Sequence, residues 1–97
     1  MVSTPRQCKD IDTATVLRFL AQQQGRWSTW GVGHSMPTVA DAMPPGTPPK
    51  LQLAKMRQIM RRGFSGGCDC GCRGDFEITD EGLAFIGELR TKPYNGY

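Results

Sequence analysis

Residues 44–49 read Pro-Pro-Gly-Thr-Pro-Pro, and this segment constrains the fold more than any other feature of the sequence. Each proline lacks an amide donor and restricts the residue before it, so a helix cannot run through the segment. We therefore expect a rigid turn here. Thr47 can cap the helix that follows and Pro48 or Pro49 can occupy its first turn, which predicts a helix over residues 49–62 that stops at Gly63.

Apolar spacing and capping residues place the other elements on either side of this turn. In chain order, the sequence predicts a helix over residues 13–24, a short strand over 27–30, two helical turns over 37–43, the helix over 49–62, a β-hairpin with arms at 64–66 and 75–79, and a helix from 79 to about 90. On the second arm Phe76 and Ile78 alternate with polar residues, which is typical of a strand with one buried face. The ends, residues 1–11 and 91–97, are expected to be irregular.

The length of 97 residues predicts a single domain, residues 1–97, with its core within residues 12–90. Hydrophobic residues make up 38% of the chain, and no apolar run approaches the roughly 20 residues that cross a bilayer, so we expect no membrane partner. Residues 1–12 carry charge and proline without the apolar stretch of a secretory signal. These features favour a cytoplasmic protein.

Charge is sorted along the chain although the net charge is only +3. Residues 47–66 contain five basic residues and no acid, whereas residues 69–88 contain six acids and one base, Arg73. Such sorting can give a nearly neutral protein one basic face that attracts a polyanion such as a nucleic acid. An ordinary solvated helix face is the alternative that the charges alone leave open.

The predicted helix over 49–62 has an apolar and a polar side when residues are placed at steps of about 100°. The apolar side carries Leu53, Met56 and Met60, with Ile59 beside them and Gln52 nearby. The opposite, exposed side carries Lys50, Ala54, Gln58 and Arg61, and Lys55 and Arg62 border it. The basic residues are therefore expected to lie on the solvent side of this helix.

Two phrases of the sequence resemble a winged helix-turn-helix domain. Residues 54–64, Ala-Lys-Met-Arg-Gln-Ile-Met-Arg-Arg-Gly-Phe, are similar to the end of a recognition helix. Residues 76–86, Phe-Glu-Ile-Thr-Asp-Glu-Gly-Leu-Ala-Phe-Ile, resemble the strand that leaves the wing and the helix after it. Residues 68–75, Cys-Asp-Cys-Gly-Cys-Arg-Gly-Asp, are similar to the wing of small winged-helix proteins of actinobacterial phages.

The resemblance spans residues 12–89 and implies a single α+β domain, mainly α, in which a helix, a short strand, a second helix, a turn, the recognition helix, a hairpin wing and a final helix follow one another. Two features depart from the family pattern. The connection over residues 25–36 is longer than most, and the turn before the recognition helix is rich in proline. Both departures bear on the angle between the two helices of the motif.

The resemblance implies that the helix over 49–62 enters the major groove of double-stranded DNA, as in a transcriptional regulator or a phage protein that assists a DNA transaction. Lys50, Lys55 and Gln58 are then candidates for bases or nearby phosphates, Arg61 and Arg62 for backbone phosphates, and Arg73 on the wing for the flanking minor groove. The full candidate set is Thr47, Lys50, Leu51, Ala54, Lys55, Gln58, Arg61, Arg62 and Arg73. One helix reads only a few base pairs, so we expect a homodimer on a repeated half-site or a protein partner.

The cysteines and the single histidine are residue types that bind zinc. They are Cys8, Cys68, Cys70, Cys72 and His34. The Cys-x-Cys-x-Cys spacing argues against zinc because structural sites usually have about two to four residues between paired ligands. We expect reduced thiols and no cofactor; zinc on Cys68, Cys70 and Cys72, or a redox switch, is the alternative.

No group in the sequence suggests catalysis, since His34 has neither an acid nor a nucleophile near it in the chain. We therefore expect a binding protein and not an enzyme. Trp27, Trp30 and Phe64 are expected to pack in the core. A module that binds a host or phage protein is the alternative function, and a joint apolar patch of Leu51 and the tryptophans would favour it.

Overall fold

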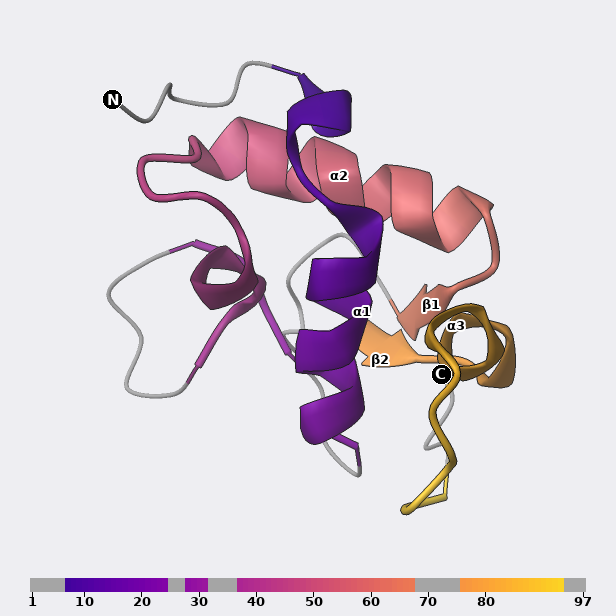
Figure 1. Cartoon of the computed structure of the whole chain (residues 1–97). Coiled ribbons are helices and arrows are strands. Elements are labelled where there is room, and N and C mark those ends of the chain that lie inside the picture. The colour runs from indigo at the N-terminus through magenta and orange to yellow at the C-terminus, as the bar shows by residue number, and fades with distance from the viewer. Residues whose placement is uncertain (1–6, 25–27, 32–36, 68–75, 94–97) are drawn as a thin grey trace.

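The computed structural model describes residues 7–24, 28–31, 37–67 and 76–93, which form a small, mainly helical α+β structure (Figure 1). Its elements are the 3₁₀ helix η1 (Cys8–Asp10), the helix α1 (Thr13–Gln22), the 3₁₀ helix η2 (Val39–Ala42), the helix α2 (Pro49–Arg61), the strands β1 (Ser65–Gly67) and β2 (Phe76–Ile78), and the helix α3 (Asp80–Ile86). The described part thus holds three α-helices and a two-stranded antiparallel sheet. This order is compatible with a winged helix.

α1 begins where the sequence predicts, because Asp12 caps it. The Asp12 carboxylate accepts hydrogen bonds from the Thr15 backbone amide at 3.1 Å and from the Thr15 hydroxyl at 2.7 Å. The helix ends at Gln22, two residues before the predicted end, and Gln23 donates its amide to the Leu20 carbonyl as the cap. Its buried side consists of Val16, Leu17, Leu20 and Ala21.

The predicted hairpin is confirmed in its two arms, which pair antiparallel with Ser65 opposite Ile78 and Gly67 opposite Phe76. On the other side of β2, the amide of Ser28 donates to Phe76 at 2.9 Å and the amide of Phe76 donates to Ser28 at 2.7 Å. Of the short strand predicted at 27–30, the described residues form this bridge at Ser28. All of β2 is buried, Glu77 included, so the expected alternation of buried and exposed residues is wrong; β2 lies between two pairing segments and against α1.

The turn before α2 uses Thr47 differently from the prediction. The Thr47 hydroxyl and amide both donate to the Pro44 carbonyl, at 2.6 and 3.2 Å, and Gly46 between them has φ +83°. Because its hydroxyl is used in this turn, Thr47 does not cap α2. The cap is Pro48, which makes no side-chain hydrogen bond, and Pro49 occupies the first turn.

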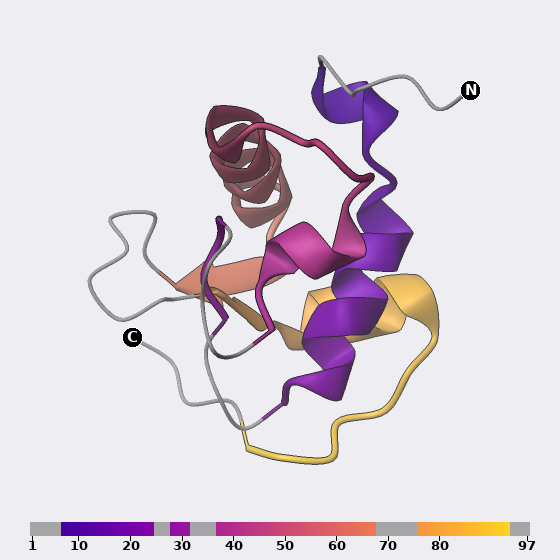
Figure 2. The same ribbon diagram turned by 90° about the vertical axis from the view of Figure 1, so that its left-hand side faces the viewer.

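η2 is shorter than the two helical turns predicted at 37–43. Thr38 and Asp41 form a reciprocal capping box around a single 3₁₀ turn, and Met43 ends it with extended backbone before the prolines. Val39 and Met43 are buried as predicted, and Ala42 is half-buried against the core. The segment therefore lies across α1 as a compact turn (Figure 2).

α3 is capped by the Thr79 hydroxyl, which accepts from the Gly82 amide at 3.1 Å. The predicted extension to residue 90 is wrong, because Gly87 takes φ +70° and turns the chain out of the helix after Ile86. The amides of Gly87 and Glu88 then close the end on the carbonyls of Ala84 and Leu83. Leu89 lies outside the helix and is 84% exposed.

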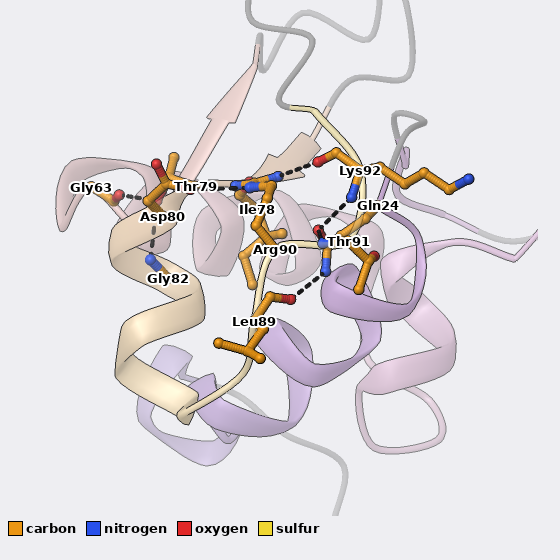
Figure 3. A network of polar contacts seen from close by, with 10 residues as sticks. All are labelled: Gln24, Gly63, Ile78, Thr79, Asp80, Gly82, Leu89, Arg90, Thr91 and Lys92. Carbon is orange, nitrogen blue, oxygen red and sulfur yellow. Dashed lines mark hydrogen bonds and ion pairs between the residues drawn. The ribbon is translucent and has the colours of Figure 1, made fainter.

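Two polar side chains hold the segment after α3 against the rest of the molecule (Figure 3). Arg90 donates to the Asp80 carboxylate at 3.0 Å and to the Ile78 carbonyl at 2.9 Å. Gln24, just after α1, donates to the Leu89 carbonyl at 3.2 Å and accepts from the Thr91 amide at 2.9 Å. The segment is thereby tied to α1 and β2, at the end of the molecule away from α2 (Figure 1).

The buried core brings together side chains from all of the larger elements. Its members are Ile11, Val16, Leu17, Leu20, Ala21, Val39, Met43, Met56, Ile59, Phe76, Ile78 and Leu83. Trp30 and Phe64 pack against it partly buried, as predicted, whereas Trp27 lies outside the described residues. Within the described ranges, none of the helices has the length and apolar character to span a bilayer.

Candidate nucleic-acid interface

α2 presents to the core a different side from the one that its apolar spacing predicts. Its buried residues are Gln52, Lys55, Met56 and Ile59, while Leu53 and Met60 are only half-buried. At about 100° per residue, the buried side is rotated by about 80° from the predicted side. The rotation changes which basic residues reach solvent.

The outward side of α2 carries a basic stripe, which we define as Lys50, Arg57 and Arg61. All three are exposed, and their spacing of seven and four residues aligns them on one face over about 16 Å of helix. Ala54, half-buried, lies within the same face. The sequence predicted Lys50, Ala54, Gln58 and Arg61 on this face. Gln58 was wrong, because it is half-buried on the flank beside Lys55. Arg57 was missed, although its spacing of seven residues from Lys50 could have found it.

The buried amide of Gln52 explains the rotation. Its Oε1 accepts from the Gly31 amide at 2.6 Å, and its Nε2 donates to the Thr47 carbonyl at 2.9 Å. Gln52 therefore joins α2 to the turn before it and to residues 28–31, which also pair with β2. With both polar ends satisfied, a 1% exposed glutamine is a stable core residue, and it fixes the side of α2 that faces inward.

Lys55 is 3% exposed, so the expectation that it borders the exposed side is wrong. Its ammonium donates to the Gln58 Oε1 at 2.9 Å. Burial lowers the pKa of Lys55 below the ordinary 10.5, and the nearby charge of Arg62 lowers it further, while Cys8 and Asp12 act in the opposite direction. Lys55 is thus turned away from the outward face.

Arg62, the residue after α2, is held by two aromatic rings. Its guanidinium carbon lies 4.7 Å from the centre of the Phe64 ring and 5.4 Å from that of Phe85. The two rings stack on each other with centres 4.6 Å apart. Cation–π attraction therefore directs Arg62 toward α3 and away from the basic stripe.

The remaining candidates are buried, half-buried or outside the described residues. Thr47 is buried in its turn, and Leu51 and Gln58 are half-buried on the flank of α2. Arg73 and the possible zinc ligands Cys68, Cys70 and Cys72 lie outside the described residues, as does His34. Among described residues, no group of three His, Cys, Asp or Glu side chains is placed to hold a metal ion.

Comparison with protein-family models, with curated proteins and with solved structures gave no match. The function is therefore inferred from the geometry of α2 and its surroundings.

Proposed function

We propose that the protein binds double-stranded DNA by placing the exposed face of α2 in the major groove, as a winged helix-turn-helix would. The supporting observation is the basic stripe of Lys50, Arg57 and Arg61, which lies on one outward face of α2. The stretch of sequence that contains this helix, residues 47–66, has no acidic residue. Positive charge that no carboxylate of its own segment offsets is the footprint of a phosphate backbone.

The position of α2 in the molecule suits insertion into a groove. The helix lies at the edge of the described structure, and in Figure 2, which looks nearly along its axis, no other described helix or strand lies outside it. Thirteen residues give a helix about 20 Å long and about 10–12 Å across, which matches the major groove of about 12 Å. The hydrogen-bonded turn from Pro44 to Thr47 leads directly into its amino-terminal end.

The residues divide by position into two roles. Lys50, in the first turn, and Arg57, near the centre, would meet base edges or the phosphates beside them. Arg61, near the carboxyl end, would meet the backbone. Lys55 and Arg62, which the sequence suggested as DNA contacts, are withdrawn from this face by burial and by the aromatic rings.

The stripe sets the expected strength of the electrostatic contribution. Neutralising three phosphates gives a slope of log affinity against log salt of about −2.7, and an affinity loss of about 40-fold between about 50 and 200 mM salt. So short a contact reads few base pairs, so a homodimer on a repeated half-site or a protein partner would complete a specific regulator.

The test is a fluorescence-anisotropy titration of labelled duplexes, both random and promoter-derived, at several salt concentrations. Arg57→Gln should reduce the magnitude of the salt slope by about 0.9. Lys92→Gln, the same loss of charge at the end of the molecule away from α2, should leave the slope unchanged (Figures 1 and 3). Absence of binding at low salt, or equal effects of the two variants, would refute the proposal.

Protein binding is the second candidate, and two exposed apolar side chains after β2 favour it. Phe85 on α3 is 48% exposed and Leu89 is 84% exposed, whereas Leu51 and Trp30, the residues expected to form such a patch, are half-buried. This function would be supported if the wild type bound no duplex and captured a protein partner that Leu89→Ser no longer held.

A further inference from the structure

A pocket lies on the flank of α2, separate from the basic stripe. It measures about 350 Å³, and its lining includes Lys9 of η1, Asp12 before α1, Lys55, Gln58 and Arg62 along α2, and Phe85 of α3. In Figure 1 the chain that leads from η1 into α1 crosses the middle of α2, and η1 contacts α2. On α2 the three residues Lys55, Gln58 and Arg62 share one side at spacings of three and four residues.

The lining carries an excess of positive charge and of hydrogen-bond donors. Three cations, Lys9, Lys55 and Arg62, face one carboxylate, that of Asp12. This carboxylate is already used, since it accepts two hydrogen bonds from Thr15 as the cap of α1. Within the described part of the chain, none of the three cations forms an ion pair with a carboxylate.

The donors are also held in place before any ligand arrives. The Gln58 Oε1 accepts from the Lys55 ammonium, so the Nε2 of Gln58 is the end of the amide that can donate to a ligand. The Lys55 ammonium keeps two further protons, and its stem is fixed by burial. Arg62 is oriented by the Phe64 and Phe85 rings. Donors fixed in this way lose little entropy on binding.

We propose that this pocket binds the phosphate group of a small phosphomonoester, with Lys55, Gln58 and Arg62 donating to its oxygens and Phe85 contacting its organic part. A phosphate has two negative charges and several acceptor oxygens, so it matches converging donors better than a single carboxylate does. The volume is at the lower end of the roughly 300–1,000 Å³ of small-molecule sites, which leaves room for an organic group beside the phosphate. The exposed part of the Phe85 ring offers that group an apolar contact.

The proposal does not rest on DNA binding and is tested without DNA. ¹H–¹⁵N NMR spectra of the full chain are recorded while phenyl phosphate, or in a second series inorganic phosphate, is added at constant ionic strength. We expect saturable shifts for residues around the pocket. Tighter binding of phenyl phosphate would identify a phosphomonoester as the ligand, whereas equal binding would identify free phosphate as sufficient.

Three variants make the test specific to the pocket. Arg62→Gln and Lys55→Met should each weaken phenyl phosphate binding by at least about tenfold, because each removes a charge-assisted hydrogen bond. Arg57→Gln removes the same charge from the opposite face of α2 and should change the affinity less than about twofold. Arg62→Gln alters an exposed residue, so it serves even if Lys55→Met disturbs the core. No saturable shift at millimolar ligand, or equal weakening in all three variants, would overturn the proposal.

Discussion

Gln52→Met is the substitution that most directly tests how α2 is oriented. Methionine fills nearly the same volume as glutamine and suits a helix, so neither a cavity nor helix propensity contributes much to the change. What is lost is the pair of hydrogen bonds at 2.6 and 2.9 Å to the Gly31 amide and the Thr47 carbonyl. The variant therefore measures the value of that polar bridge.

The magnitude follows from what becomes of the two backbone groups. A buried group left without its partner costs about 1–3 kcal/mol, and the gain from burying a more apolar side chain offsets part of the total. Gly31 is half-buried and can be reached by water, which lowers its share, whereas Thr47 is buried. We expect the free energy of unfolding to fall by about 2–4 kcal/mol, equivalent to roughly 10 °C or more in Tm for a domain of this size.

The assay is urea denaturation followed by tryptophan fluorescence, since Trp30 packs on Phe76 with ring centres 5.9 Å apart and reports on this region. Gln22→Met on the exposed side of α1 is the matched control and should change stability by less than about 0.5 kcal/mol. A second variant, Gln52→Glu, keeps the acceptor for Gly31 but loses the donor to Thr47, and protonation of the new carboxyl should restore that donor in acid. If Gln52→Met were as stable as the wild type, the side of α2 assigned to the core would be incorrect.

Three further predictions concern single contacts. At Gly82 an added Cβ would overlap the Phe64 carbonyl oxygen and lie 2.9 Å from Ile78 Cγ1, so Gly82→Ala should lower the free energy of unfolding in urea by more than about 2 kcal/mol. Gly87→Ala, which meets no atom within 4 Å but has φ +70°, should lower it by about 1 kcal/mol. Asp12→Ala removes the cap of α1 and should cost about 1 kcal/mol of stability near neutral pH. Hydrogen bonds from the Thr15 hydroxyl and amide lower the pKa of Asp12 below 3.8, so the contribution of the cap is present above pH 3.8 and is lost as pH falls through the folded-state pKa. At lower pH the unfolding curves of the wild type and the variant should converge. Burial lowers the pKa of Lys55 below 10.5, so the unfolded chain holds more protons between the two values and wild-type stability should rise with pH in that window relative to Lys55→Met; parallel pH profiles in denaturation would contradict it.

The element boundaries that the sequence predicted well are those with a local chemical cause. Asp12 begins α1 with its own carboxylate, and Thr79 begins α3 with its hydroxyl. Gly63, with φ +80°, follows the end of α2 as predicted, although the last helical residue is Arg61 and not residue 62. Leu89 was misplaced because its apolar spacing continues the helix pattern, while Gly87 stops the helix first. A glycine at a helix end can outweigh the periodicity that follows it, since it satisfies the last carbonyls at little conformational cost.

The orientation of α2 could not be obtained from the sequence for a different reason. Helical spacing sorts residues by polarity, and by that measure Gln52 and Lys55 belong at or outside the border of the core. Gln52 is inside because two backbone groups from distant segments meet its amide, and Lys55 follows it on the same side. Such partners are fixed only by the tertiary structure, so helical spacing alone could not correct the difference of about 80° between the predicted and the observed buried side of α2.

The orientation of α2 divides the five basic residues within 47–66 between two sites. One pair of variants can test this division. Lys50, Arg57 and Arg61 face outward, whereas Lys55 and Arg62 line the pocket. Arg57→Gln should therefore weaken DNA binding and spare phenyl phosphate, and Arg62→Gln should do the reverse, although both remove one charge from the same helical segment. If Arg62→Gln lowered the DNA salt slope by the same amount of about 0.9 as Arg57→Gln, Arg62 would leave its aromatic rings for a backbone phosphate on binding, and the five basic residues would act as one surface.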